Sequence, residues 1–164
     1  IGGYHFAFMP TNSEAASRLR EFKNRDKKPF AVMFLNLDEV REYCEVSEKE
    51  AAILTSSARP IVLLKKKKDF VLEICGESDR IGALLPCNPL QILLLEETGP
   101  LVMTSGNRGG EPIIISEEEM QEVIKNECVA NVDLETGEVL KNTSIDKDIM
   151  TLLHSLLDGK LEVQ

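Results

Sequence analysis

Four cations stand within six consecutive residues near the start of the chain, although its formal net charge is −9. Lys23, Arg25, Lys27 and Lys28 follow a predicted helix and precede Pro29 and an apolar run. A polyphosphate needs several cations converging from a fixed loop, and arginine adds a planar fork of donors for oxyanions. A second interpretation fits equally well, because cations at the C-terminus of a helix also stabilise the helix dipole.

A second polar segment, residues 104–112, follows a predicted strand and reads Thr-Ser-Gly-Asn-Arg-Gly-Gly-Glu-Pro. Ser105 and Asn107 place a hydroxyl and a carboxamide two residues apart, and the three glycines let backbone amides approach an anion closely. The segment lacks both the Gly-Lys-Ser/Thr ending of a Walker A loop and the G-x-G-x-x-G pattern. A nucleotide site and a long glycine-rich turn are both consistent with these residues.

The remaining candidates have simpler structural explanations. His5 lies among apolar residues of a predicted strand, which is typical of a structural histidine. The run Lys65–Lys68 predicts a solvated turn, with RNA binding as the alternative. The four cysteines form no C-x-x-C pair and no metal-ligand spacing is present, so we expect no metal site and buried, reduced thiols.

The composition limits the class of protein. The chain has 164 residues, of which 43% are hydrophobic and 29% charged, and this balance is typical of a globular fold. The acidic net charge argues against a nonspecific nucleic-acid or membrane-surface protein. No apolar run approaches the ~20 residues that span a bilayer, and no secretory signal opens the chain, so a cytoplasmic location is expected. Because the chain begins Ile1-Gly2-Gly3 without Met, we expect it to be a piece of a longer protein.

Short apolar runs alternate with amphipathic runs, which predicts an α/β (α+β) fold around a mixed sheet. Strands are expected at residues 4–9, 30–35, 60–64, 70–75, 81–85 and 101–104, with a hairpin at 129–134 and 139–140. Helices are expected at residues 11–23, 37–44, 47–56, 88–97, 116–126 and 149–157. Both polar segments then fall on loops beside strands, where ligand groups usually gather.

Several of the helix starts carry a capping signal. Thr11, Ser47 and Ser116 are each followed three residues later by Glu, which is the pattern of a capping box. Asn88 precedes Pro89, which fits an N-cap followed by the first helical position.

Six collinear stretches of residues 1–113 together resemble the YrdC-like domain of HypF, the carbamoyltransferase of nickel–iron hydrogenase maturation. They are Gly-Gly-Tyr-His-Phe at 2–6, Lys-x-Arg-x-x-Lys-Pro-Phe-Ala-Val-Met at 23–33, Ser-Ala-Arg-Pro-Ile-Val-Leu-Leu at 57–64, Leu-Pro-x-Asn-Pro-Leu at 85–90, Leu-Leu-Leu-Glu at 93–96 and Leu-Val-Met-Thr-Ser-Gly-Asn at 101–107. The first and third stretches favour HypF over the threonylcarbamoyl-adenylate synthases of the same YrdC family. The chain departs from the family pattern at Gln91, Arg108 and Gly109, where His, Leu and Ser are usual.

The resemblance implies a twisted mixed sheet flanked by helices, with a concave, positively charged cleft that binds a nucleotide. The family's motif residues carry over to Lys23, Arg25, Lys28, Ser105 and Asn107 as nucleotide-binding residues, with His5 and Arg59 as further pocket residues. The implied ligands are ATP with Mg²⁺ and a carbamate-level substrate, which together give carbamoyl-adenylate. The implied partners are the remaining HypF-type domains and HypE, whose C-terminal cysteine receives the carbamoyl group.

We therefore expect residues 1–164 to form a single YrdC-like domain of a larger carbamoyltransferase, incomplete as an enzyme when alone. Two alternatives stay open. The first is a threonylcarbamoyl-adenylate synthase for tRNA modification. The second is a non-catalytic YrdC-like module that binds a nucleotide or RNA.

Overall fold

A computed structural model describes residues 3–25, 28–67, 72–127, 131–132 and 139–140 of the chain. The chain divides into two compact units, residues 1–113 and residues 114–164. The second unit contains α6 (Glu117–Glu127) and the antiparallel pair of β7 (Asn131–Val132) and β8 (Val139–Leu140). The hairpin expected there is confirmed in its two strands.

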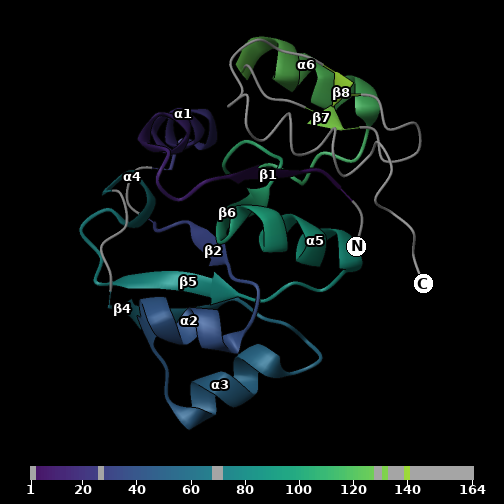
Figure 1. Cartoon of the computed structure of the whole chain (residues 1–164). Coiled ribbons are helices and arrows are strands. Elements are labelled where there is room, and N and C mark those ends of the chain that lie inside the picture. The colour runs from purple at the N-terminus through teal and green to yellow at the C-terminus, as the bar shows by residue number, and fades with distance from the viewer. Residues whose placement is uncertain (1–2, 26–27, 68–71, 128–130, 133–138, 141–164) are drawn as a thin grey trace. The chain divides into compact units, whose positions relative to one another are not determined.

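The first unit is built on a six-stranded mixed sheet in the order β1-β6-β2-β5-β4-β3 (Figure 1). Its strands are β1 (His5–Phe8), β2 (Ala31–Met33), β3 (Cys44–Glu45), β4 (Val62–Lys66), β5 (Arg80–Leu84) and β6 (Leu101–Ser105). Among the described pairs of this sheet, only β2–β5 is parallel. Its helices are α1 (Ser13–Lys23), α2 (Leu37–Tyr43), α3 (Glu48–Thr55), α4 (Leu72–Cys75) and α5 (Pro89–Thr98). The predicted α/β class with a mixed central sheet is confirmed.

One face of this sheet is packed with apolar side chains. The strand register puts Phe6, Phe8, Val32, Leu64 and Val102 on the same face, and all five are buried. Helix α1 covers part of it, because the ring of its Phe22 meets the ring of Phe6 edge to face at 5.5 Å. Burial of these side chains accounts for the main hydrophobic stabilisation of the unit.

The opposite face, here called the open face, is only partly packed. Towards α5 it carries a cluster of Met33, Leu95 and Leu101 with further apolar side chains around it. Five of its strand residues are exposed, namely His5, Ala7, Leu63, Lys65 and Arg80, whereas Gly82 on the same face is buried. Strand β4 shows the contrast directly, since Leu64 is fully buried and Leu63 is 57% exposed.

The helix starts largely follow their capping residues. The Ser47 capping box is confirmed: Ser47 N–H donates to Glu50 Oε2 at 2.8 Å, and Glu50 N–H donates to Ser47 Oγ at 3.4 Å. Asn88 caps α5 as predicted. The prediction at Thr11 is wrong by one residue, because Asn12 Oδ1 accepts from the N–H of Ala15 at 2.9 Å and caps α1. Asparagine is the stronger N-cap of the two residue types.

Two predicted elements differ from the structure. The run predicted as a strand at 70–75 contains the short helix α4 instead. The alternation of a short apolar run cannot distinguish a buried helical turn from a strand. The predicted turn at Lys65–Lys68 is also wrong where it is described, since Lys65 and Lys66 belong to β4. Lys68 and the final helix predicted at 149–157 lie outside the described residues.

The described cysteines Cys44, Cys75 and Cys87 are free thiols. Cys44 and Cys75 are buried as expected, and burial raises the pKa of Cys44 to about 11, so it stays a protonated apolar side chain. Cys87 is exposed, contrary to the prediction, because it directly precedes the N-cap of α5. Within the described ranges, each helix is too short or too polar to cross a membrane.

Candidate functional site

The sheet topology brings the two polar segments to the same edge. Strands β1 and β6 are antiparallel, so His5 at the start of β1 pairs with Ser105 at the end of β6. Strand β2 is antiparallel to β6, so the chain enters β2 at the edge where β6 ends (Figure 1). The segment that precedes β2 and the segment that follows β6 therefore meet.

Lys23 joins the two segments directly. Its side chain leaves the last turn of α1, and the residue is only 5% exposed. Its Nζ donates to the carbonyl oxygen of Ser105 at 2.6 Å, to that of Asn107 at 2.9 Å and to Asn107 Oδ1 at 3.0 Å. All three donors of the ammonium are therefore used. Burial, assisted by the charge of Arg25, lowers the pKa of Lys23 to about 8.

The side chains of Ser105 and Asn107 are held in a fixed arrangement. Ser105 Oγ donates to Asn107 Oδ1 at 2.5 Å, and Asn107 Nδ2 donates to the carbonyl oxygen of Glu111 at 2.5 Å. The N–H of Gly106 between them donates to the carbonyl oxygen of Tyr4 at 2.7 Å, which ties the segment to β1. Asn107 Oδ1 thus accepts from both Ser105 and Lys23, and these two hydrogen bonds fix the orientation of the carboxamide.

The glycine-rich segment lies against the C-terminus of α1. A Cβ at Gly109 would stand 2.1 Å from the carbonyl oxygen of Lys23, so only glycine fits this approach. The guanidinium of Arg108 lies over the ring of Phe22 at 4.8 Å from its centroid. Two of the departures from the family pattern, Arg108 and Gly109, thus both contribute to this contact with α1.

The second cation of the first segment, Arg25, stabilises its own loop. Its Nε donates to the carbonyl oxygen of Lys28 at 3.2 Å and its Nη2 to that of Pro29 at 2.7 Å. The guanidinium lies over the ring of Phe30, 5.1 Å from the centroid. Burial, together with the charge of Arg20, lowers the pKa of Arg25. The Lys28 side chain is exposed and makes no hydrogen bond or ion pair with another residue in the described part of the chain.

Arg20 also belongs to this site, and the sequence analysis did not identify it. Its Nη1 donates to the carbonyl oxygen of Arg25 at 2.6 Å and its Nη2 to that of Ile74 at 3.2 Å. The guanidinium lies over the ring of Phe30 at 4.8 Å from its centroid. The available signal was its place in the last turn of a helix, where basic side chains reach free carbonyl groups.

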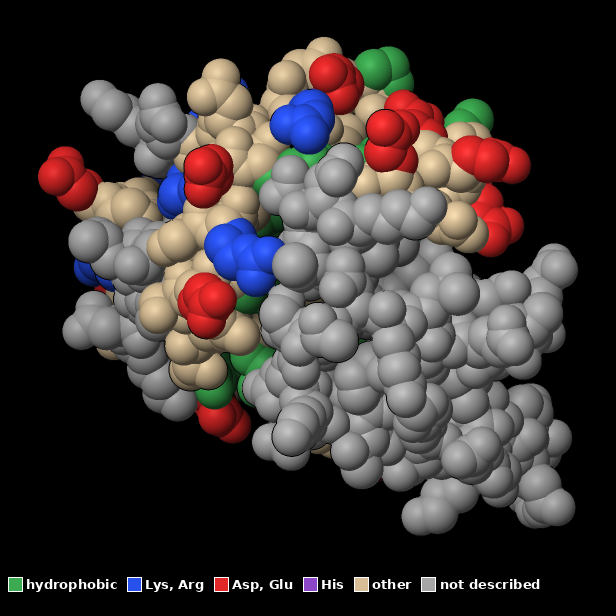
Figure 2. All heavy atoms as spheres, turned by 90° about the horizontal axis from the view of Figure 1, so that it is seen from above, with side chains coloured by type: hydrophobic (Ala, Val, Ile, Leu, Met, Phe, Trp, Pro, Cys, Tyr) green, Lys and Arg blue, Asp and Glu red, His purple; other side chains and the backbone are tan. Residues whose placement is uncertain are grey.

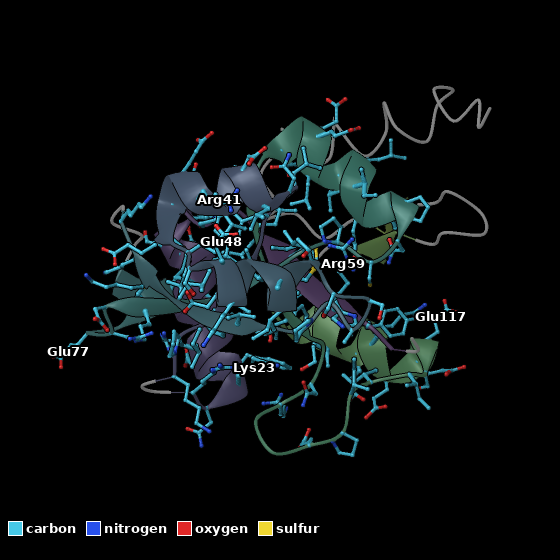
Figure 3. The ribbon with its side chains drawn as sticks, turned by 90° about the horizontal axis from the view of Figure 1, so that it is seen from below. Lys23, Arg41, Glu48, Arg59, Glu77 and Glu117 are labelled. Atoms are coloured by element: carbon cyan, nitrogen blue, oxygen red, sulfur yellow. The ribbon has the colours of Figure 1, made fainter. Side chains whose placement is uncertain are left out.

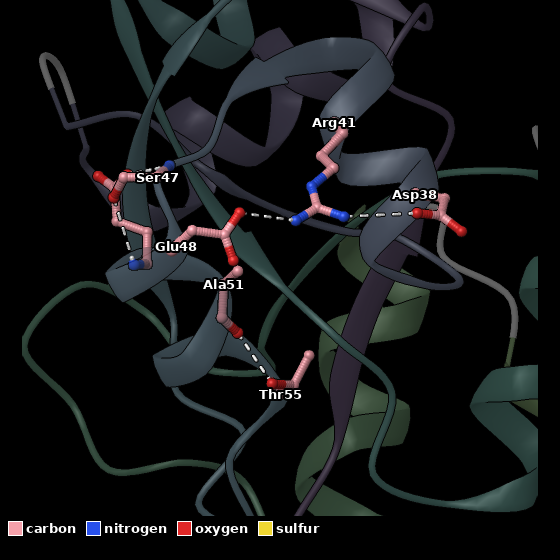
Figure 4. Close-up of polar contacts among 7 residues, drawn as sticks. Asp38, Arg41, Ser47, Glu48, Ala51 and Thr55 are labelled. Atoms are coloured by element: carbon pink, nitrogen blue, oxygen red, sulfur yellow. Dashed lines mark hydrogen bonds and ion pairs between the residues drawn. The ribbon is translucent and has the colours of Figure 1, made fainter.

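Within the described part of the chain, no carboxylate neutralises the positive charge of Lys23 and Arg25. Their hydrogen bonds go to carbonyl and amide oxygens, and among the described residues no Asp or Glu forms an ion pair with either. The ion pairs that are described lie elsewhere, such as those of Arg41 with Asp38 and Glu48 (Figure 4). On the face seen in Figure 2, Lys/Arg and Asp/Glu side chains are interspersed. The predicted concave, positively charged cleft stays a prediction.

His5 and Arg59 lie at different edges of the sheet. His5 pairs with Ser105, so the two side chains share the open face, and Lys23 reaches the Ser105 carbonyl from α1, which covers the packed face. Arg59 precedes β4, whose first residue Val62 pairs with Ala83 near the end of β5, and it therefore lies at the opposite edge (Figure 3). Arg59 is exposed in a turn with a φ of 43°. The structure thus groups His5 with the other candidate residues and does not group Arg59 with them.

The lysines behind the RNA alternative have partners of their own. Lys65 pairs with Glu45 at 3.0 Å, and Lys67 Nζ donates to the carbonyl oxygen of Arg41 at 2.9 Å. Among the described residues there is no group of three or more His, Cys, Asp or Glu side chains that could hold a metal ion.

The family model described as "Telomere recombination", which covers Sua5, YciO and YrdC proteins, matches residues 1–151. This chain belongs to that family. Carbamoyltransferase HypF2 of Cupriavidus necator is 39% identical across 73% of this chain, which spans 17% of that protein. Threonylcarbamoyl-AMP synthase of Pseudoalteromonas atlantica is 30% identical across 73% of this chain and 68% of that protein.

Solved structures agree with this membership of the Sua5/YciO/YrdC family. The crystal structure of full-length HypF in its phosphate- and nucleotide-bound form shares 46% identity and a TM-score of 0.72, covering 77% of this chain and 17% of that one. The resemblance to HypF and the YrdC-like fold that it implied are thereby confirmed. The chain spans less than a fifth of the HypF proteins that it matches.

We expect Gly109→Ala to displace the glycine-rich segment, because its new methyl group would overlap the carbonyl of Lys23. Overpacking of this kind costs about 1–3 kcal/mol. Denaturant unfolding should give a lower free energy of unfolding, and amide exchange should accelerate at residues 105–109. Glu111→Ala, at an exposed position of the same segment, is the control. Wild-type stability and exchange in Gly109→Ala would refute the close contact.

Lys23 should titrate well below the other lysines. In protein labelled with ¹³C-lysine, one Cε resonance is expected to shift with a midpoint near pH 8, and it should vanish in Lys23→Arg. Because the pKa is about 8 when folded and 10.5 in the reference state, the unfolded chain binds more protons between these values. The free energy of unfolding should therefore gain a contribution that rises from pH 8 to 10.5 and is absent in Lys23→Arg. Lysine resonances that all titrate near 10.5 would contradict this.

Proposed function

We propose that this chain binds the phosphates of ATP at the edge formed by Lys23, Arg25, Lys28, Ser105 and Asn107, as the adenylate-forming domain of a HypF-type carbamoyltransferase. The observation that carries the proposal is the hydrogen bonding of a nearly buried Lys23 ammonium to Ser105 and Asn107, with no described carboxylate beside it. A buried cation without a counter-ion is costly, and a bound polyanion would supply the missing charge. A titratable group with a strongly shifted pKa is also common at functional sites.

The three cations would have different roles in binding the phosphates. Lys23 and Arg25 are engaged with oxygen atoms of the protein, so they would act through their field and by fixing the loop. Lys28 is exposed and would contact a phosphate directly. Ser105 and Asn107 would hydrogen-bond the nucleotide phosphate or the carbamoyl group, and the hydrogen bond from Ser105 Oγ to Asn107 Oδ1 would break for this purpose.

The open face next to this edge suits a nucleoside. The Ile61 side chain lies over Gly82 in the middle of the sheet, since a Cβ at Gly82 would stand 2.9 Å from Ile61 Cγ2, and it presents an apolar surface there. Ile61 is 59% exposed and Leu63 is 57% exposed, so apolar surface is available for a planar base. His5, on the same face, lies on β1, beyond β6 from this surface, where it pairs with Ser105 beside the phosphate-binding residues.

The reaction would be adenylyl transfer. A carbamate oxygen would attack the α-phosphorus of ATP, carbamoyl-adenylate would form and pyrophosphate would leave. The fixed cations would stabilise the charge that develops on the phosphates. Mg²⁺ would arrive with the nucleotide, held mainly by phosphate oxygens and water. Delivery of the carbamoyl group to a cysteine of HypE, in the cytoplasm, would require the other HypF-type domains.

Lys28→Ala should weaken ATP binding without harm to the fold. Loss of one charged contact to a phosphate corresponds to roughly tenfold weaker affinity. Calorimetric titration of ATP with MgCl₂ into the folded wild type and the variant measures this. Lys49→Ala removes an exposed lysine of α3 and is the matched control. A folded wild type that binds no ATP, or equal affinities for the two variants, would refute the proposed site.

The second candidate function is threonylcarbamoyl-AMP synthesis. It rests on the 30% identity to the Pseudoalteromonas atlantica synthase, of which this chain covers 68%. The two functions differ in their acyl substrate, so pyrophosphate release from ATP in the presence of bicarbonate and ammonium, which together supply carbamate, should not depend on threonine if the HypF assignment holds. Release that requires threonine would select the synthase instead.

A further inference from the structure

The loop that carries the phosphate-binding cations is held by a guanidinium from α1. Arg20 Nη1 donates to the carbonyl oxygens of Arg25, at 2.6 Å, and of Lys28, at 3.2 Å. These two carbonyls belong to the two ends of the segment that turns from α1 towards β2. One side chain therefore links the backbone of Arg25 to that of Lys28.

The same guanidinium fixes the loop to the body of the sheet. Its Nη2 donates to the carbonyl oxygen of Ile74 in α4 at 3.2 Å, and that oxygen also accepts from the N–H of Phe30 at 2.9 Å. Its plane lies over the buried ring of Phe30, 4.8 Å from the centroid. Helix α4 and the entry to β2 are thus joined to the loop through Arg20.

Arg20 also acts on the other cations of the site. The Lys28 carbonyl accepts from Arg20 and from Arg25 Nε, both at 3.2 Å, so the backbone that presents the Lys28 side chain is held from two sides. The N–H of Arg25 donates to the carbonyl oxygen of Arg20 at 3.0 Å, next to Asn24 in its left-handed conformation.

We propose that Arg20 is a positioning residue, which holds the backbone of Arg25 and Lys28 in the conformation that binds phosphate without touching the ligand. This inference rests on the proposed function. Its basis is the geometry of the fork: the carbonyl oxygens of Arg25, Lys28 and Ile74 all accept from one rigid, planar guanidinium. A lysine ammonium is a point charge on a flexible stem and cannot reproduce that set of contacts.

The test compares Arg20→Gln and Arg20→Lys with Arg18→Gln, which removes one positive charge from the same helix at a residue paired with Glu14. Both Arg20 variants should bind ATP with Mg²⁺ at least about fivefold more weakly than wild type, because a displaced loop loses its alignment. Cleavage by trypsin within residues 23–28, followed by mass spectrometry, should be several-fold faster in both. Arg18→Gln should match wild type in both measurements.

The outcomes separate this inference from the proposed function. Full rescue of affinity by Arg20→Lys would mean that charge alone matters and would overturn the positioning role, as would an Arg20→Gln that behaves like Arg18→Gln. If wild type binds no ATP, the proposed function fails, and trypsin cleavage alone then decides: wild-type cleavage rates in both Arg20 variants would overturn the role of Arg20. Thermal melts identify any variant that fails to fold, and the other Arg20 variant then carries the comparison.

Discussion

One ammonium group joins parts of the chain that lie more than 80 residues apart. Lys23 Nζ bonds to Ser105 and Asn107, across sequence separations of 82 and 84 residues. It is satisfied by three oxygen atoms and is nearly buried. Hydrogen bonds to neutral oxygens offset the loss of hydration of an ammonium only in part. The Lys23 ammonium is therefore fully hydrogen-bonded but has no counter-ion among the described residues, and this favours an anionic ligand.

Other features of the edge support this contact. Gly109 allows the segment after β6 to approach the end of α1, and Arg108 covers Phe22 beside it. On the other side, Arg20 and Arg25 both lie over Phe30, which is fully buried and also packs against Phe8. The aromatic side chains thus connect the polar edge to the packed face of the sheet. Each of these guanidinium groups lies over a core ring, so packing of the core helps to hold the site in place.

Much of this could be predicted from the sequence, and the failures have identifiable causes. Capping at Ser47 and Asn88 was predictable because these side chains bond to amides only three residues away. The meeting of Lys23 with Ser105 and Asn107 followed from the family resemblance, since local patterns carry no information on contacts so distant. The role of Arg20 was hidden because its acceptors are backbone carbonyls, which every residue has. Helix α4 was mistaken for a strand because four apolar-rich residues fit either period.

The close approach at Gly109 has a consequence for how such a site can change over time. The atom that excludes a side chain there is the carbonyl oxygen of Lys23, the last residue of α1. The length of that helix and the residue at 109 are therefore coupled: a serine at 109, usual in the family pattern, requires α1 to end differently or the loop to stand further off. The coupling runs through the backbone, so any side chain at 109 requires a different backbone course at the end of α1 or in the loop, whatever residue stands at 23.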